Sequence, residues 1–193
     1  LYDSDGRRYV DMYNNVPCVG HANPAVVHAM AEQQATVNVH GRYLHEGIVT
    51  FAERLTGLNH DDIESVVFSC SGTEANEVAI QMARIVTGNH GLICTDAAYH
   101  GNSELVGSLS YLWIDPLKSR DVRAFPYPDC YRPLVEGLSE GELCEAYLAR
   151  VTTAIDSLKT EGTGLAALIM CPIFANEGLP DIPSGFMTDI TSL

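Results

Sequence analysis

The stretch over residues 66–84 constrains the fold of this chain more than any other. It begins with a short apolar run, breaks into small hydroxyl residues and a glycine, and resumes with alanines and aliphatics at helical spacing. This pattern predicts a strand over residues 65–69, a tight turn, and a helix from Thr73 to about Val86. Backbone N–H groups that are unpaired at such a helix start, assisted by the helix dipole, form a natural binding site for a phosphate.

The residues of the turn suit an anion as well as a helix start. Gly72 lets the backbone approach a ligand closely, and the hydroxyl groups of Ser71 and Thr73 can donate hydrogen bonds to phosphate oxygens. The alternative is an ordinary N-capped helix that binds nothing, and the turn taken alone favours that alternative. The two interpretations are separated only by what surrounds the turn.

The rest of the chain alternates between strand and helix patterns. The expected strands are 91–95, 122–125 and 165–170, and the expected helices are 25–37, 46–58, one from about 103, and 143–160. Such alternation predicts an α/β fold with three layers, α/β/α, around a mainly parallel sheet that is covered on both faces. In this architecture ligands bind beyond the carboxyl ends of the strands, and three motifs fall at such ends: 69–73, 97–100 and 171–174.

The amino-terminal part differs in character from the alternating part. Asp5-Gly6 stands between two short segments, which predicts a tight hairpin turn, and Asn23 followed by Pro24 predicts a capped, amphipathic helix. We therefore expect residues 1–45 to be an amino-terminal segment of hairpin, helix and loop from a smaller domain, and residues 46–193 to be part of a large domain. Because the chain has no initiator Met and stops in the expected start of a helix, we expect a fragment of a longer polypeptide.

Composition excludes some classes of partner. The formal net charge of −14 argues against binding to nucleic acid and to anionic membrane surfaces, because no basic stripe is present to meet their phosphates. The six cysteines are widely scattered, which predicts reduced thiols in a cytoplasmic protein rather than a zinc site or a disulfide framework. No signal peptide and no apolar run of membrane-spanning length is present. No metal site is predicted.

Several motifs occur in a fixed order along the chain. They are Tyr2-Asp3-x-Asp5-Gly6-x-x-Tyr9-x-Asp11, Val19-Gly20-His21-Ala22-Asn23-Pro24, Ser71-Gly72-Thr73-Glu74-Ala75-Asn76 and Tyr99-His100-Gly101-Asn102. Together they resemble the class III aminotransferases, which are pyridoxal-phosphate-dependent enzymes of fold type I. The resemblance extends from the first hairpin to about Phe186. Two further motifs, Asn15-Val16-Pro17 and Arg42-Tyr43-Leu44-His45, resemble the branch that contains the amino-alcohol phosphate phospho-lyases.

The resemblance implies pyridoxal phosphate as the cofactor and assigns residues to it. Gly72 and Thr73 match the positions that hold the cofactor phosphate, with Ser71 beside them. Tyr99 matches the aromatic residue that stacks on the pyridine ring, as a flat, electron-poor ring requires on one face. His100 matches the position that follows this aromatic residue.

The substrates that the resemblance implies are an amino donor and a 2-oxo acid, bound by a homodimer. Tyr13, Asn14 and Tyr43 are candidates for substrate contact. For the segment from Arg42 to His45, a solvated loop or a dimer contact is an equally good interpretation.

Two residues that the family's chemistry requires are not found in the chain. A Schiff-base lysine and an aspartate against the pyridine nitrogen are both expected beyond Leu193, since neither Lys118 nor Lys159 matches the family's lysine. We therefore predict no catalytic residue within the chain and no activity of the chain alone. A further departure is Cys171, at a position where relatives commonly have glutamate; either Asn176-Glu177 compensates for it, or Cys171 is simply a small buried residue.

The sequence leaves three candidate functions. The leading one is the amino-terminal part of a class III aminotransferase that moves an amino group between an amino acid or amine and a 2-oxo acid. The second is a phospho-lyase that acts on an amino-alcohol phosphate. The third, from a different class, is a non-catalytic binding domain that has kept the fold.

Overall fold

The structure is a computed structural model that describes residues 1–11, 17–59, 62–110 and 121–193. It divides into two compact units, 1–66 and 67–193. This division differs from the boundary at 45/46 expected from the sequence, which stays a prediction for the complete protein. The two units are described separately.

The first unit opens with the expected turn. Tyr2 and Arg8 form an antiparallel bridge, and Asp3 Oδ1 accepts hydrogen bonds from the N–H groups of Asp5 (3.1 Å) and Arg7 (2.8 Å). Gly6, with φ of +79°, supplies the left-handed backbone conformation that this turn requires. The Asp-Gly hairpin is thus confirmed.

Two helices follow in the first unit, each started by a side-chain cap. Helix α1 covers Pro24–Thr36, and Asn23 Oδ1 accepts from the N–H groups of Ala25 (3.0 Å) and Val26 (3.4 Å). Helix α2 covers Glu46–Thr56, and His45 Nδ1 accepts from the N–H of Gly47 at 3.1 Å. These caps satisfy donors that a helix start would otherwise leave unpaired.

The predicted amphipathic character of α1 is wrong. Val26, Val27 and Met30 share one side of the helix, but they are exposed, and no described residue of 1–66 is buried. The alanines at 25, 29, 31 and 35 occupy the other sides, so that apolar residues surround the helix instead of forming one stripe. The capping residues predicted the start of this helix correctly, whereas the apolar spacing wrongly predicted one buried apolar face.

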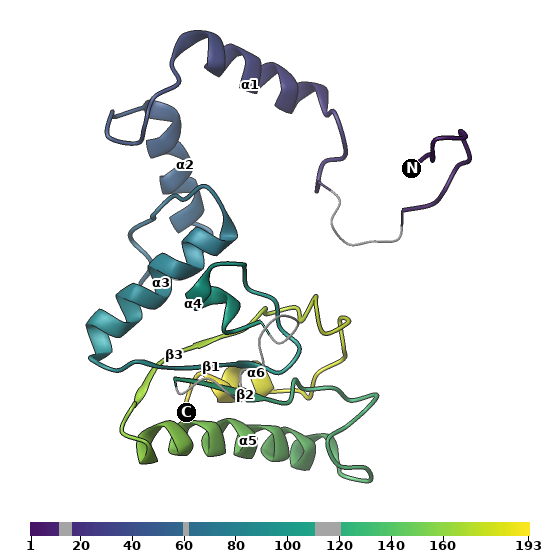
Figure 1. The fold of residues 1–193 in the computed structure, drawn as a ribbon, viewed down its shortest axis with the longest axis vertical. Helices are drawn as coiled ribbons and strands as arrows, with labels where there is room; N and C mark the ends of the chain where they lie inside the picture. The colour runs from purple at the N-terminus through teal and green to yellow at the C-terminus, as the bar shows by residue number, and fades with distance from the viewer. Residues whose placement is uncertain (12–16, 60–61, 111–120) are drawn as a thin grey trace. The chain divides into compact units, whose positions relative to one another are not determined.

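The second unit is built on a parallel sheet of three strands (Figure 1). The strands are β1 (Gly91–Thr95), β2 (Val122–Phe125) and β3 (Leu165–Ile169), in the order β2-β1-β3. Ile93 pairs with Arg123 on one side and with Leu168 on the other. Strand β1 is buried along its whole length because it is the central strand of the sheet.

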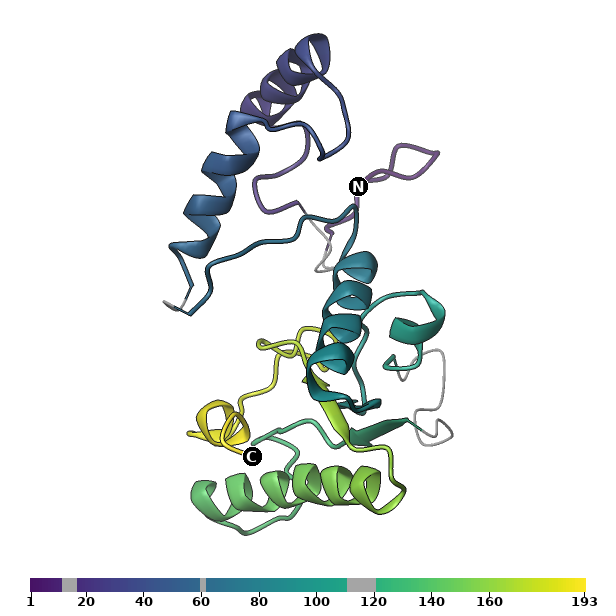
Figure 2. The ribbon, with the colours of Figure 1, turned by 90° about the vertical axis from the view of Figure 1, so that its left-hand side faces the viewer.

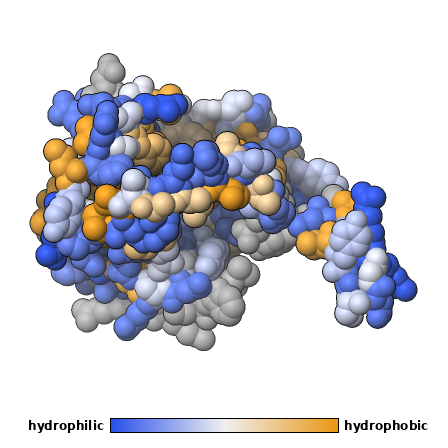
Figure 3. Space-filling model, turned by 90° about the horizontal axis from the view of Figure 1, so that it is seen from above, coloured by the Kyte–Doolittle hydropathy of each residue, from blue (hydrophilic) through white to orange (hydrophobic). Residues whose placement is uncertain are grey.

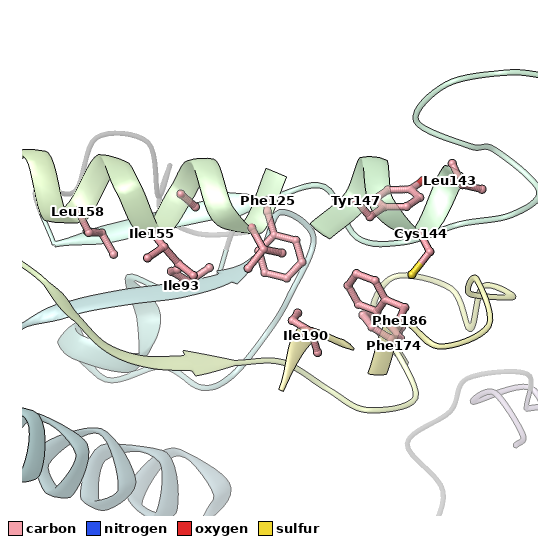
Figure 4. Close-up of a cluster of buried hydrophobic side chains, with 12 residues drawn as sticks. Ile93, Phe125, Leu143, Cys144, Tyr147, Ile155, Leu158, Phe174, Phe186 and Ile190 are labelled. Atoms are coloured by element: carbon pink, nitrogen blue, oxygen red, sulfur yellow. The ribbon is translucent and has the colours of Figure 1, made fainter. Parts of the chain in front are cut away.

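Helices cover both faces of this sheet, which confirms the α/β/α prediction. On one face lie α3 (Gly72–Thr87) and the short α4 (Glu104–Gly107); on the other lies α5 (Glu140–Thr160), with α6 (Phe186–Ile190) against it (Figures 1 and 2). Each face has its own apolar cluster. The α5 cluster, shown in Figure 4, contains Ile93, Phe125, Tyr147, Leu158, Phe174 and Phe186 among others, and the α3 cluster contains Ile80, Leu92, Cys94, Val106, Leu109 and Val122.

Helix α5 begins earlier than its apolar periodicity predicts. Ser139 Oγ accepts from the N–H of Glu142, and the Glu142 carboxylate accepts from the N–H of Ser139 at 2.8 Å. This reciprocal capping box sets the start of the helix at Glu140 instead of Leu143.

The predicted strand over residues 65–69 is wrong: the structure has no strand there. A strand exists only where its backbone pairs with a neighbour, and the sheet of β1, β2 and β3 does not include this stretch. Val67 and Phe68 are accordingly exposed. The apolar, β-branched residues favour a strand here, but the structure offers this stretch no neighbouring strand to pair with.

Apolar side chains also reach the surface elsewhere. On the face shown in Figure 3, hydrophobic residues are interspersed with hydrophilic ones. The side chains of Met82, Ile85 and Val86 on α3 are also exposed. None of the described helices combines the length and the hydropathy needed to cross a membrane.

Candidate cofactor site

The start of α3 is N-capped and yet keeps donors for a ligand. Ser71 Oγ accepts from the N–H of Glu74 at 3.2 Å, and Glu74 Oε2 accepts from the N–H of Cys70 at 2.7 Å. Within the described part of the chain, no group accepts from the N–H of Gly72 or of Thr73. A Cβ placed on Gly72 would meet no heavy atom within 4 Å, so the helix start is open on that side. The N-cap and the anion site predicted from the sequence are therefore compatible.

A second loop packs directly on this helix start. The N–H of Asn102 donates to Thr73 Oγ1 at 3.4 Å, and Asn76 Nδ2 donates to the carbonyl oxygen of His100 at 2.8 Å. Gly101 has φ of +143°, and a Cβ on it would lie 2.5 Å from Thr73 Oγ1 and 3.0 Å from Thr73 Cα. Only glycine permits so close an approach in this backbone conformation. The structure thus brings together the turn 71–73 and the loop 99–102. The loop follows the carboxyl end of β1 as predicted, whereas the turn does not follow a strand.

Tyr99 and His100 differ in exposure and in polar surroundings. Tyr99 is 37% exposed, so its ring is accessible to a ligand. The N–H of His100 donates to Ser110 Oγ at 3.0 Å, whereas its ring atom Nε2 is buried and has no hydrogen-bond partner among the described residues. Burial lowers the pKa of His100, and the nearby Glu177 carboxylate opposes this effect.

Thr95 and Glu177 form a buried polar pair near this loop, which the sequence analysis did not identify. Thr95 Oγ1 donates to Glu177 Oε1 at 2.6 Å, and both side chains are buried. Burial raises the pKa of Asp96, and Glu177 adds to the increase. Burial, with smaller contributions from the two carboxylates, also raises the pKa of the Cys94 thiol to about 12, so that this thiol stays protonated. Glu177 was noted in the sequence only as a neighbour of Cys171, because no local pattern predicts that it meets Thr95.

Cys171 lies just past the end of β3 and is half-buried. Its carbonyl oxygen accepts from the N–H of Phe174 at 3.0 Å, and the buried Phe174 has φ of +49°. The segment after β3 is therefore a tight, locally closed turn rather than a continuation of the strand.

The candidates for substrate contact are not placed at this site by the structure. Tyr13 and Asn14 lie outside the described residues. Tyr43 belongs to the first unit, where it is exposed and its ring lies 5.3 Å from the ring of His40. A role for these three residues stays a prediction.

The two lysines are likewise not brought to the site. Lys118 lies outside the described residues. Lys159 is exposed near the end of α5, 3.5 Å from Asp156, and lines an open pocket with Gly164 and Leu165 at the amino end of β3. The turn 71–73 and Tyr99 lie at the other side, beyond the carboxyl end of β1. In the described ranges, no group of three His, Cys, Asp or Glu residues could hold a metal ion.

Comparisons with known proteins identify the family. The profile described as aminotransferase class-III matches residues 1–193. The alanine–glyoxylate aminotransferase 2-like protein of Drosophila melanogaster is 33% identical over 96% of this chain and 39% of its own length.

Two solved structures resemble the chain closely. A phospholyase from Arthrobacter, in complex with phosphoethanolamine, has a TM-score of 0.87 and 39% identity, and the match covers 100% of this chain and 45% of that one. A taurine:2-oxoglutarate aminotransferase from Bifidobacterium kashiwanohense, in complex with PLP and glutamate, has a TM-score of 0.83 and 27% identity, over 99% of this chain and 45% of that one. This chain spans less than half the length of these relatives. With the profile matching from the first residue to the last, the chain belongs to the class III aminotransferases.

Proposed function

We propose that residues 1–193 are the amino-terminal part of a pyridoxal-phosphate-dependent enzyme that transfers an amino group between an amino acid or amine and a 2-oxo acid. Class III aminotransferases use pyridoxal phosphate. The observation that carries the proposal is the contact between Thr73 and the loop 99–102, which unites an anion-binding helix start with an accessible aromatic ring. Neither feature alone is specific, whereas their juxtaposition suits a cofactor that is a phosphate ester of a flat heterocycle.

The residues present suit the phosphate of this cofactor. The N–H groups of Gly72 and Thr73, which have no acceptor among the described residues, and the hydroxyl groups of Ser71 and Thr73 can donate to it. The α3 dipole favours its negative charge. The open space beside Gly72 allows the backbone to approach the phosphate oxygens. The Glu74 carboxylate is turned back toward the N–H of Cys70, where it satisfies one more donor of the helix start.

The aromatic loop would orient the cofactor ring and shield it. Tyr99 would cover one face of the ring and exclude water from it. Because its pKa is lowered by burial, His100 adds no positive charge beside the ring at neutral pH. When bound, pyridoxal phosphate withdraws electrons from the carbon that carries the amino group and so makes its proton acidic.

A lysine must move that proton, and we propose that it lies outside residues 1–193. Lys159 is at the amino end of β3, whereas Tyr99 follows the carboxyl end of β1 and its loop packs on the turn 71–73. In parallel α/β sheets ligands bind at the carboxyl ends, so Lys159 does not occupy a catalytic position. On this proposal residues 1–193 alone do not catalyse the reaction.

A phospho-lyase is the second candidate function, favoured by one observation. The Arthrobacter phospholyase, solved with phosphoethanolamine, is 39% identical, a higher value than for the aminotransferases compared above. A lyase would release phosphate and ammonia from an amino-alcohol phosphate, consume one water and leave a carbonyl compound. It would need the same cofactor site and no 2-oxo acid.

An assay on the full-length protein with pyridoxal phosphate separates the candidates. One set of reactions contains an amine and a 2-oxo acid, with alanine and glyoxylate or taurine and 2-oxoglutarate as the first pairs; another contains phosphoethanolamine alone. We expect amino-group transfer, measured as the new amino acid by chromatography, without phosphate release. Phosphate release that does not depend on a 2-oxo acid would replace the transferase proposal by the lyase. Cofactor binding without either reaction, or no cofactor binding, would favour a non-catalytic domain.

We further propose that the complete protein is a homodimer located in the cytoplasm. The six cysteines support a reducing compartment, since all of them are free thiols. Sedimentation of the full-length protein and the microscopy of a tagged copy test the two proposals; a fully active monomer, or a tagged copy inside an oxidising compartment, would contradict them.

A further inference from the structure

Three side chains on one side of α3 bind the aromatic loop. Thr73, Asn76 and Glu77 are spaced three and four residues apart, which places them next to one another on the helix surface. Thr73 Oγ1 accepts from the N–H of Asn102 at 3.4 Å, and Glu77 Oε1 accepts from Ser103 Oγ. The helix that begins at the proposed phosphate site therefore also fixes the position of this loop.

Asn76 makes the contact that is nearest to Tyr99 along the loop. Its Nδ2 donates to the carbonyl oxygen of His100 at 2.8 Å, and both residues are half-buried. The N–H of His100 donates to Ser110 Oγ at 3.0 Å. The two peptide groups that flank the Cα of His100 are thus both held, and one of them is held by a side chain of α3.

Tyr99 projects from a backbone that is fixed on both sides. Ala98, which precedes it, is 1% exposed, and Gly101 is buried against Thr73. Between these fixed points Tyr99 itself is exposed, so its ring can meet a ligand while its backbone stays in place. A flat ligand stacked on this ring is therefore set at a definite separation from the start of α3.

We propose that Asn76 is a positioning residue of the cofactor site, whose hydrogen bond to His100 fixes the ring of Tyr99 relative to the phosphate site at Gly72 and Thr73. Pyridoxal phosphate is a rigid ring joined to its phosphate by a short linker. Its two ends bind at once only if the two contact points keep a fixed separation, and a preorganised site binds more tightly. This inference rests on the proposed function only for the identity of the cofactor, and it applies equally to a transferase and to a lyase.

A role of Asn76 in the fold alone makes a different demand. The hydrogen bond would then contribute to the free energy of unfolding, and its loss would leave the affinity for the cofactor unchanged. A positioning role requires that its loss weaken the binding of a ligand that reaches both contact points, but not of a ligand that reaches the phosphate site alone.

The experiment compares two ligands, pyridoxal phosphate and inorganic phosphate, on the full-length protein without cofactor. Pyridoxal phosphate is titrated by its absorbance, and inorganic phosphate is measured by competition with it. Asn76→Ala should weaken the affinity for pyridoxal phosphate by about three- to tenfold, the effect of losing one hydrogen bond, and leave the affinity for inorganic phosphate unchanged. It should also reduce the circular dichroism of the bound cofactor, because the ring is no longer held in one orientation.

The matched control is Asn89→Ala. Asn89 Nδ2 donates to the carbonyl oxygen of Leu165 at 2.9 Å, and Asn89 is half-buried like Asn76. This bond joins the same chemical groups, but it lies at the amino end of β3, where Asn89 lines the open pocket beside Gly164. Its loss should leave the affinities for both ligands unchanged.

Asn76→Ala should fold, because alanine suits the interior of a helix better than asparagine does. A second variant, Asn76→Gln, keeps an amide that can donate and should bind pyridoxal phosphate more tightly than Asn76→Ala. Wild-type affinity and dichroism in Asn76→Ala would overturn the proposal, as would an equal loss of affinity for both ligands or an Asn76→Ala that does not fold. A wild type that binds no pyridoxal phosphate would instead refute the proposed function, and this inference with it.

Discussion

The substitution Gly101→Ala tests the contact on which the candidate site depends. The new Cβ would lie 2.5 Å from Thr73 Oγ1 and 3.0 Å from Thr73 Cα, against ordinary contacts of 3.4–4 Å. The hydroxyl can rotate away, but Cα belongs to the first turn of α3 and cannot. The φ of +143° adds strain of its own, because L side chains rarely adopt it.

The expected loss of free energy follows from the close contact with Thr73 and from the strained φ. Strained backbone conformations of this kind cost about 1–3 kcal/mol each. If the loop stays in place, the free energy of unfolding should fall by about that amount. If the loop instead moves off α3 to relieve the strain, cofactor binding must restore the contact, and the same energy weakens the affinity for pyridoxal phosphate by about 5- to 150-fold.

The assay combines chemical denaturation with cofactor titration of the full-length protein. The control is Gly141→Ala in the exposed first turn of α5, where an added Cβ meets no heavy atom within 4 Å. Replacing a helical glycine by alanine there should stabilise the protein by up to about 1 kcal/mol and leave the cofactor affinity unchanged. A Gly101→Ala variant with wild-type stability and wild-type affinity would refute the argument.

Three further changes test other parts of the structure. Ser71→Ala removes the cap of α3 and should lower the free energy of unfolding by about 1 kcal/mol in chemical denaturation, whereas Ser71→Gly should cost only a few tenths; equal losses would contradict the capping role. Tyr147→Phe deletes a buried hydroxyl that accepts from two backbone N–H groups and donates to a carbonyl oxygen, and it should cost about 1–3 kcal/mol in the same assay; a neutral result would contradict these bonds. Mass spectrometry after brief alkylation of the native protein should find Cys18 and Cys70 modified and Cys94 unmodified, since Cys18 and Cys70 are exposed whereas Cys94 is buried and its pKa is raised to about 12; early modification of Cys94 would contradict its burial. Because its folded pKa is raised, the stability that the buried Cys94 thiol contributes is present below pH 9 and is lost as pH rises toward 12.

The parts of the fold that local chemistry determines could be predicted from the sequence. The cap at Ser71 and the helix that follows it depend on residues within one turn of each other, and so does Asn23 before Pro24. The three strands are short apolar runs between turn signals, and the structure has each of them within one residue of its expected bounds. The early start of α5 was also readable, because Ser139 and Glu142 form a capping box in the sequence that periodicity alone overlooks.

The features that depend on distant partners could not be predicted in this way. Residues 65–69 have the composition of a strand, but a strand needs a neighbour, and the described sheet supplies none for them. The hydrogen bond between Thr95 and Glu177 joins the end of β1 to the turn after β3, and no local sequence pattern near either residue predicts it. Gly101 was predicted within a motif, but its contact with Thr73 follows only from the packing of the loop on α3.

The most direct measurement of the central claim is an experimental structure of the full-length protein with pyridoxal phosphate bound. The account predicts that the phosphate accepts hydrogen bonds from the N–H groups of Gly72 and Thr73 and that the ring of Tyr99 lies against one face of the pyridine. A phosphate bound elsewhere, or a Tyr99 ring turned away from the cofactor, would contradict it.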